Sequence, residues 1–165
     1  MLKIIITGPE SSGKTTLCKA LSNRFKIPFS KEYAREYLKK LVGDYTQEDL
    51  IKIAKEQLNS EQNSSLLDTD LITIKIWSNY KYDSCDNWIL EQIESQKTEN
   101  RFYLLCKPDI AWKADPLREN AANRMQLFET YKEELKNLNY DYYIVKGENR
   151  TMNAISKILV QKPFI

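Results

Sequence analysis

The sequence contains no histidine among its 165 residues. This absence excludes histidine general bases, histidine-ligated metal sites and the histidine-containing phosphate motifs of nucleotidylyl transferases. The three cysteines, Cys18, Cys85 and Cys106, are odd in number and widely spaced, which is typical of small buried thiols and not of a disulfide framework or a zinc site. Acid–base chemistry in this protein must therefore come from carboxylates.

The chain also lacks long apolar runs and any large excess of one charge. No stretch approaches the roughly 18 apolar residues of a membrane span, and 25 Lys and Arg against 23 Asp and Glu leave a net charge of +2. We therefore expect no nucleic-acid or membrane partner. The N-terminus begins with a strand pattern instead of a signal peptide, which predicts a cytoplasmic location. The length favours a single domain over residues 1–165, and a homo-oligomer remains open.

Glycine is scarce as well, yet two of the four glycines lie in one motif. Residues 8–16, GPESSGKTT, follow the apolar run 2–6 and fit the P-loop pattern GxxxxGK[ST]. Such a loop turns its backbone N–H groups toward phosphates, while Lys14 adds a mobile positive charge and Thr15 a hydroxyl for Mg²⁺. The motif predicts that ATP and Mg²⁺ bind through Gly8, Glu10, Ser11, Ser12, Gly13, Lys14, Thr15 and Thr16.

Strand patterns alternate with helix patterns along the whole chain. Strand patterns occupy 2–7, a short piece near 29–30, 64–67, 101–106 and 140–145. Helical patterns occupy 14–25, 32–41, 71–82, 88–97, 124–138 and 151–160, with a further helix after Thr46. This alternation predicts a three-layer α/β fold with a parallel sheet whose ligands bind at the carboxyl edge of the strands. The dinucleotide-binding version is disfavoured because no GxGxxG motif is present.

Acidic side chains follow two of the predicted strands. Asp68 comes directly after strand 64–67 and is a candidate to hold Mg²⁺ through water near Thr15. Glu32 and Asp70 are both candidates for the base that accepts the proton of a substrate hydroxyl, and the sequence leaves that choice open. Arg35 shares a helix face with Glu32 and is a candidate to fix the substrate.

Two further segments are candidates for substrate contacts. Asp70, Thr73, Trp77 and Tyr80 recur on one side of a predicted helix, and this set suits a ribose that carries a flat base. The segment at about 107–123 breaks periodicity and predicts a lid loop, in which Trp112 is a further substrate candidate.

Basic residues and a glycine complete the predicted donor site. We expect Arg118, with Arg124 at the start of the next helix, to close over the phosphates and neutralise the transferring group. Gly147 follows the last strand at a place where a backbone turn would pass the adenine, and Arg150 is a candidate to stack on that ring.

The motifs at 8–15, 32–36 (EYARE), 67–70 (LDTD) and 115–118 (DPLR) resemble the ribosylnicotinamide kinase domain of NadR-type NAD-biosynthesis proteins and its stand-alone bacterial relatives. The resemblance runs in order along essentially the whole chain. It implies a P-loop fold of the nucleoside and nucleotide kinase type with strand order 2-3-1-4-5. It also implies ATP-dependent phosphorylation of the 5′-hydroxyl of nicotinamide riboside to nicotinamide mononucleotide, with Trp77 or Trp112 placed to attract the cationic ring.

Two other functions stay open from the sequence. One is a nucleotide-dependent ATPase or switch that binds a protein or lipid partner. The other is a nucleoside-monophosphate kinase, which would need additional cations such as Lys31 and Arg35 to hold the acceptor phosphate.

Overall fold

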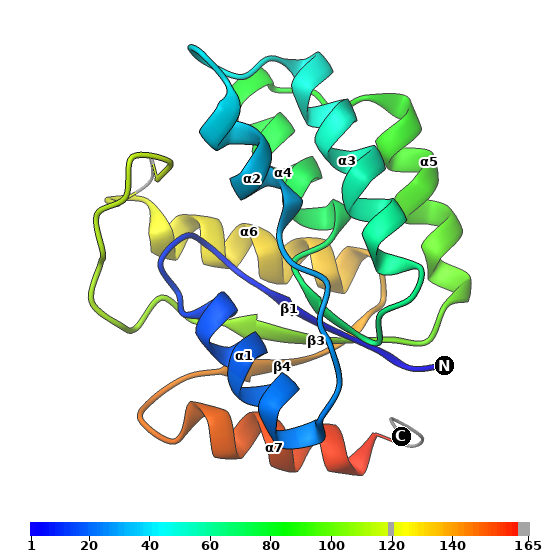
Figure 1. Cartoon of the computed structure of the whole chain (residues 1–165), viewed down its shortest axis with the longest axis vertical. Coiled ribbons are helices and arrows are strands. Elements are labelled where there is room, and N and C mark those ends of the chain that lie inside the picture. Colours follow the sequence, from blue (N-terminus) through cyan, green and yellow to red (C-terminus); the bar gives the residue numbers. More distant parts are fainter. Residues whose placement is uncertain (119–120, 162–165) are drawn as a thin grey trace.

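The computed structural model describes residues 1–118 and 121–161 of the chain. In this part, four parallel strands form one sheet: β1 (Lys3–Thr7), β2 (Leu66–Asp68), β3 (Arg101–Cys106) and β4 (Asp141–Val145), in the order β2-β1-β3-β4. The strands are apolar runs because helices cover both faces of the sheet (Figure 1). This arrangement confirms the predicted three-layer α/β P-loop fold. The single domain over residues 1–165 stays a prediction, because it includes residues outside the described ranges.

The predicted strand near residues 29–30 is reduced to a single bridge between Ser30 and Leu67. Ser30 N–H donates to the carbonyl of Leu66 (2.9 Å), and its carbonyl accepts from the N–H of Asp68 (2.8 Å). Pairing stops there because Pro28 lacks an N–H and the chain enters α2 (Tyr33–Lys40) three residues later. The expected order 2-3-1-4-5 therefore holds for its remaining four strands.

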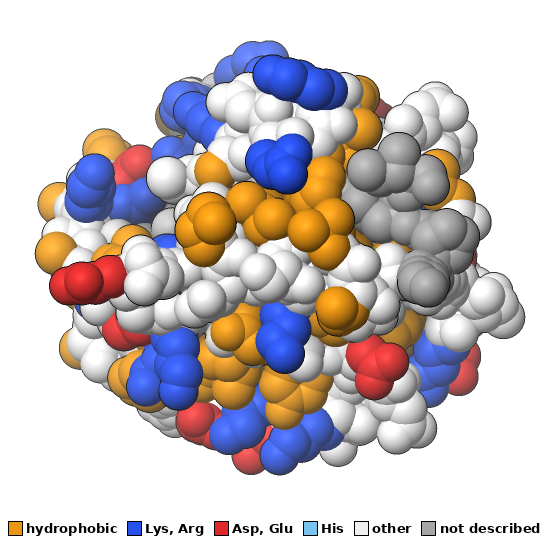
Figure 2. Space-filling model, turned by 90° about the horizontal axis from the view of Figure 1, so that it is seen from below, with side chains coloured by type: hydrophobic (Ala, Val, Ile, Leu, Met, Phe, Trp, Pro, Cys, Tyr) orange, Lys and Arg blue, Asp and Glu red, His pale blue; other side chains and the backbone are white. Residues whose placement is uncertain are grey.

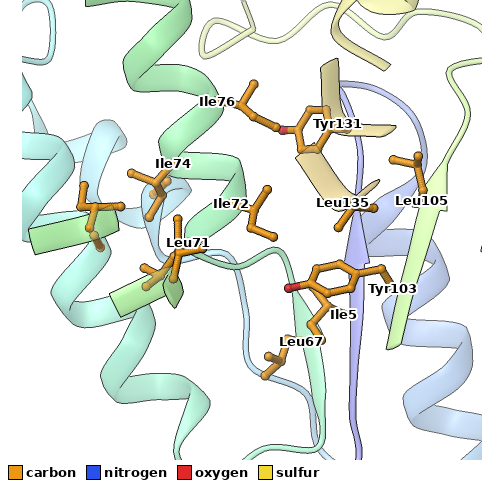
Figure 3. Close-up of a cluster of buried hydrophobic side chains, with 14 of the residues drawn as sticks. Ile5, Leu67, Leu71, Ile72, Ile74, Ile76, Tyr103, Leu105, Tyr131 and Leu135 are labelled. Atoms are coloured by element: carbon orange, nitrogen blue, oxygen red, sulfur yellow. The ribbon is translucent and has the colours of Figure 1, made fainter. Parts of the chain in front are cut away.

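Alternate residues of the strands feed two separate cores. Ile4 and Ile6 of β1 pack with α1 (Lys14–Phe25) and α7 (Arg150–Val160) on one face of the sheet. Ile5 belongs to the larger core on the other face, where Figure 3 shows it close to Tyr103 and Leu135. The helices that contribute to that core are α2, α3 (Gln47–Glu61), α4 (Leu71–Tyr82), α5 (Asn87–Ser95, followed by a 3₁₀ turn at Gln96–Thr98) and α6 (Arg124–Asn137).

A buried polar network lies where β3 begins. The Arg101 guanidinium is fully buried and pairs with Glu61 (Nη2 to Oε2, 2.8 Å) and with Asp70 (Nη1 to Oδ2, 3.3 Å). Burial raises the pKa of Glu61 to about 7, against the opposing effect of Arg101. Asp70 also accepts from the hydroxyl of Tyr103 (2.6 Å), so the network joins α3, α4 and β3.

The outer face of α7 carries three exposed apolar side chains, Met152, Leu159 and Val160. Viewed from that side, the surface shows apolar groups separated by polar and basic side chains (Figure 2). Exposed apolar groups alone do not show an interface between copies of the chain, so the homo-oligomer stays a prediction. Within residues 1–118 and 121–161, no helix has the length and hydropathy needed to cross a bilayer.

Candidate active site

The P-loop connects the carboxyl end of β1 to the N-terminus of α1, as its sequence predicts. Two positions require glycine: Gly8 has φ 132° and a Cβ there would lie 2.6 Å from the carbonyl oxygen of Cys106, whereas Gly13 has φ 85° and begins the helix. The hydroxyl of Ser12 donates to the carbonyl of Pro9 (2.7 Å) and fixes the turn. The loop backbone is thereby shaped to receive an anion at the helix N-terminus.

Lys14 lies across the mouth of this loop. Its ammonium donates to the carbonyls of Gly8 and Pro9, both at 2.8 Å. These neutral acceptors leave the positive charge uncompensated by any carboxylate within salt-bridge distance in the described residues. A phosphate that enters the loop meets this charge directly.

Thr15 and Asp68 come together at the ends of α1 and β2. The hydroxyl of Thr15 donates to Oδ2 of Asp68 (2.7 Å). Oδ1 of Asp68 is buried and has no hydrogen-bond partner in the described part of the chain. Burial raises the pKa of this carboxyl, while Thr15 and Lys14 act in the opposite direction. A hydroxyl beside a carboxylate with one unused oxygen fits a hydrated Mg²⁺, so the residues present suit the predicted ion.

Glu32 stands at the N-cap of α2 and lines the same cavity as the P-loop. Its carboxylate makes no hydrogen bond with the residues that the structure describes. The pKa of Glu32 is raised, mainly by burial, and Lys14 opposes this shift. A carboxylate that protein donors do not use and whose proton affinity is increased is suited to accept a proton from a hydroxyl.

Asp70 and Thr73 lie elsewhere, which corrects two substrate predictions. Asp70 is fully buried and caps α4: Oδ1 accepts from the N–H of Ile72 (3.1 Å), and Oδ2 from Tyr103 and Arg101. Thr73 is also buried, with its hydroxyl 3.4 Å from that of Thr7. Neither residue lines the cavity, because the polar core network holds the start of α4. Of the two base candidates, the geometry favours Glu32.

Two adjoining cavities meet at this edge of the sheet. The first, of about 120 Å³, is lined by the P-loop residues 8 and 10–16 together with Glu32, Arg35, Leu38, Trp77, Leu117, Arg118 and Tyr131. The second, of about 270 Å³, is lined by Glu10, Leu38, Leu41, Gly43, Asp44, Tyr45, Trp77, Tyr80, Lys81, Pro116, Leu117 and Leu127. The predicted aromatic pair Trp77 and Tyr80 thus borders the second cavity. The first cavity is charged and the second is largely aromatic and aliphatic.

Among the described residues of the predicted lid, 107–118 and 121–123, Leu117 and Arg118 line the first cavity. Arg118 lines the cavity and donates to the carbonyl of Lys113. Arg124 instead donates to the carbonyls of Ser11 and Ile110 (both 3.2 Å), so it supports the P-loop from outside. Trp112 lines neither cavity because its ring lies against Arg118 and Arg124, with their guanidinium carbons 6.0 and 5.4 Å from its centroid. Its predicted substrate contact is therefore not observed.

Two pairs of residues that sequence reasoning missed hold the lid. Arg35 forms an ion pair with Asp115 (2.9 Å), which ties α2 to the lid. Arg150 does not lie open for stacking on adenine: it pairs with Asp109 (2.7 Å) and donates to the carbonyl of Ser12 (2.7 Å). The position of Asp109 just beyond the end of β3 was the only sequence signal for this second pair.

Gly147 belongs to the same arrangement. Its N–H donates to Oδ2 of Asp109 (2.8 Å), and its φ of 73° makes the turn after β4. Gly147 lines neither cavity, so its predicted place beside adenine has no support from the cavity lining.

Comparisons with known proteins agree with this architecture. A family model described as an AAA domain matches residues 3–151. The trifunctional NAD biosynthesis/regulator protein NadR of Salmonella typhimurium is 29% identical over 158 residues, which cover 87% of this chain and 38% of that protein. The chain therefore spans about two fifths of the length of this curated relative.

Solved structures extend the comparison. A NadR protein in complex with NR matches with a TM-score of 0.74 and 26% identity, over 94% of this chain and 50% of the other. A deoxyadenosine kinase from M. mycoides matches with a TM-score of 0.62 over 98% of this chain and all of the other, at 16% identity, which shows a common fold alone. The resemblance to NadR-type proteins seen in the sequence motifs is thereby confirmed.

Proposed function

The chain belongs to the AAA-domain family that its residues 3–151 match, and from this premise we propose that it is an ATP- and Mg²⁺-dependent nucleoside kinase. Its proposed acceptor is the 5′-hydroxyl of a small nucleoside, with nicotinamide riboside as the first candidate. The observation that carries the proposal is the position of Glu32, an unengaged carboxylate facing the P-loop cavity next to a second, aromatic cavity.

In this proposal the donor half of the site binds the triphosphate. The P-loop N–H groups and Lys14 hold the β- and γ-phosphates, while Thr15 and Asp68 would hold Mg²⁺. The ion, when bound, neutralises charge on the β- and γ-phosphate oxygens. Arg118, which lines the cavity from the lid, adds positive charge where the phosphoryl group moves, and lid closure excludes water that would hydrolyse ATP.

The acceptor half binds a nucleoside in the second cavity. Its hydroxyl approaches the γ-phosphate beside Glu32, whose carboxylate accepts the hydroxyl proton as the new O–P bond forms and the bond to the β,γ-bridging oxygen breaks. ADP is released, and the proton leaves Glu32 for solvent when the lid opens. Trp77 offers an aromatic face to the base, and a cationic pyridinium ring gains roughly 0.5 to 2 kcal/mol from such a face.

The alternative acceptor, a nucleoside monophosphate, finds little support in the same cavities. Lys31, one of the cations that it would need, is exposed and lines neither cavity. Arg35, the other, already pairs with Asp115.

The decisive experiment measures ADP formation by the purified chain with ATP, Mg²⁺ and a panel of nucleosides that includes nicotinamide riboside, adenosine, deoxyadenosine and cytidine. We expect at least one nucleoside to raise turnover well above basal ATP hydrolysis and to appear as its 5′-monophosphate by mass spectrometry, with Lys14→Ala inactive. Turnover that no nucleoside stimulates would count against the kinase and favour the nucleotide-dependent switch.

A second experiment tests the base. Glu32→Gln is expected to lower kcat by about 10²- to 10⁴-fold with little change in KM. The matched substitution Asp70→Asn is expected to lower the free energy of unfolding instead, because it disturbs a buried ion pair. The reverse pattern would reassign the base to Asp70.

A further inference from the structure

We propose that Tyr131 of α6 binds the acceptor: its phenol donates a hydrogen bond to the 5′-hydroxyl oxygen of the nucleoside and holds that oxygen between the γ-phosphate and Glu32. This inference rests on the proposed nucleoside kinase activity and adds one residue to the acceptor half of the site. Tyr131 lies outside the four sequence motifs.

Tyr131 reaches the first cavity from the face of the sheet opposite to α1. The P-loop runs into α1, which packs on one face, whereas Tyr131 belongs to the larger core on the other face. Figure 3 shows its hydroxyl directed toward α4, near Ile76. The side chain is 1% exposed, yet it lines the cavity together with Glu32 and Lys14. Packing therefore fixes the phenol in the wall of the site.

The hydroxyls of Thr7, Thr73 and Tyr131 form a row of hydrogen-bonding groups. The Thr7 and Thr73 oxygens are 3.4 Å apart. Thr73 also hydrogen-bonds to Tyr131 and lowers the pKa of the phenol, as a hydroxyl does when it donates to the phenol oxygen. In the part of the chain that the structure describes, the phenol makes no further hydrogen bond. A phenol that accepts from Thr73 keeps its own hydrogen for a second partner in the cavity.

The other hydroxyls of the cavity lie on the side that binds phosphates. The described lining contains four of them, all within residues 11–16. Ser12 donates to a carbonyl of the loop (2.7 Å), and Thr15 donates to Asp68 (2.7 Å). Tyr131 is thus the hydroxyl of this lining that comes from another element and has a hydrogen to donate to the acceptor.

The neutral charge of the phenol suits a position beside the base. Burial raises the pKa of Tyr131 above its ordinary value, Thr73 opposes this rise, and the charge of Glu32 adds to it. The phenol therefore stays protonated at the pH of the reaction, and the effect of Glu32 shows that the two groups interact electrostatically. Lys14 and Arg35 oppose the burial that raises the pKa of Glu32. A neutral donor instead orients the acceptor hydroxyl without lowering the proton affinity of the base.

The test is a binding cycle that removes the phenol hydroxyl and the 5′-hydroxyl separately and together. The probes are nicotinamide riboside and adenosine, each paired with its 5′-deoxy analogue, and their affinities for wild type and Tyr131→Phe are measured by calorimetry with ADP and Mg²⁺ present. Loss of the 5′-hydroxyl should weaken binding to the wild type more than binding to Tyr131→Phe. We expect this difference to be roughly threefold to tenfold, the contribution of one neutral hydrogen bond.

Kinetics give a second readout that a merely structural role would not produce. Tyr131→Phe should lower kcat/KM for the nucleoside on the order of tenfold. It should leave KM for ATP and the rate of ATP hydrolysis without nucleoside within twofold of wild type, because the donor side of the cavity is unchanged.

Tyr103→Phe is the matched control. Tyr103 is another fully buried tyrosine of the same core, but its hydroxyl donates to Asp70 (2.6 Å) and it lines neither cavity. This variant should unfold at lower urea concentration and keep the wild-type result in the binding cycle. Thr73→Val provides a second variant in case Tyr131→Phe does not fold. It keeps the phenol but removes the hydroxyl that holds it, and should reduce the effect of the 5′-hydroxyl in the same direction.

The inference is overturned if the 5′-hydroxyl contributes to binding within twofold equally in wild type and Tyr131→Phe, or if Tyr103→Phe changes that contribution as much. A nucleoside that is phosphorylated while the cycle shows no coupling refutes the role of Tyr131 alone. Binding without phosphorylation refutes the proposed function, and the cycle still decides the contact. If no nucleoside binds, the inference and the proposed function both fail.

Discussion

Gly13→Ala should destabilise the protein through a neighbour that lies far away in sequence. A Cβ at residue 13 would lie 2.8 Å from Nη1 of Arg150 and 3.3 Å from Cδ1 of Ile110. The same Nη1 donates to the carbonyl of Ser12 at 2.7 Å. The new methyl group must therefore displace the guanidinium from this hydrogen bond.

The magnitude follows from two separable costs. An L-residue in the left-handed conformation that Gly13 adopts, with φ 85°, costs about 1 to 2 kcal/mol. Loss of a hydrogen bond to a charged group costs about 1.5 to 3 kcal/mol. We expect Gly13→Ala to lower the free energy of unfolding by roughly 2.5 to 5 kcal/mol in the wild-type background. In an Arg150→Ala background, only the backbone cost of about 1 to 2 kcal/mol should remain.

Urea unfolding of the wild type, the two single variants and the double variant measures the coupling between the sites, about 1.5 to 3 kcal/mol if the reasoning holds. Gly43→Ala is the matched control, because Gly43 has φ 89° and a Cβ there would meet nothing within 4 Å. Its cost should be the backbone cost alone in both backgrounds. An equal cost of Gly13→Ala with and without Arg150 would refute the displacement argument.

Three further predictions concern the metal, the pH dependence of stability and the lid. Asp68→Asn should raise the Mg²⁺ concentration needed for half-maximal velocity by about 10- to 100-fold, and an unchanged Mg²⁺ titration would contradict the assignment. Stability should fall as pH rises through about 7, because the raised pKa of Glu61 makes the native state bind a proton more tightly than the unfolded chain. Urea unfolding at pH 5.5 and 8 should detect this slope, and Glu61→Gln should flatten it. Asp115→Asn breaks the half-exposed pair with Arg35 and should change stability by less than about 1 kcal/mol. It should nevertheless raise ATP hydrolysis relative to phosphoryl transfer, and an unaltered ratio would argue against a lid role.

The donor half of the site was readable from the sequence because it is local. Gly8, Gly13 and Lys14 stand in one short loop whose conformation depends on the glycines themselves, and Thr15 follows on the helix that the loop begins. Asp68 was found by a second local signal, its place at the end of an apolar strand. The rule that parallel strands end at a common edge then brings it to Thr15.

The contacts that hold the lid left no such signal. Arg35 and Asp115 are 80 residues apart, and Arg150 and Ser12 are 138 apart. From the sequence, an arginine near a helix N-terminus is interpreted as a solvent-exposed residue or as a ligand contact. Hydrophobic periodicity predicts which face of a helix or strand is buried. It does not predict which carbonyl, distant in sequence, a guanidinium will contact. The same reason explains why Trp112 was expected to face the substrate, whereas its ring lies against Arg118 of the lid and Arg124 of α6.

The position of Asp70 could not be predicted from the sequence for a different reason. It depends on a single backbone angle, the φ of Thr69. In a continuous strand, Asp68 and Asp70 would point to the same side, because side chains alternate with a period of two. Thr69 lies between them with φ 72°, a left-handed conformation that breaks this alternation. A threonine held in that region costs about 1 to 3 kcal/mol, and the capping of α4 by Asp70 and its bonds to Tyr103 and Arg101 supply compensation. The strained turn therefore separates the two carboxylates, leaving Asp68 at the phosphate edge and drawing Asp70 into the core. Glu32, which follows the bridge at Ser30 and caps α2, is then the remaining candidate for the base of the proposed reaction.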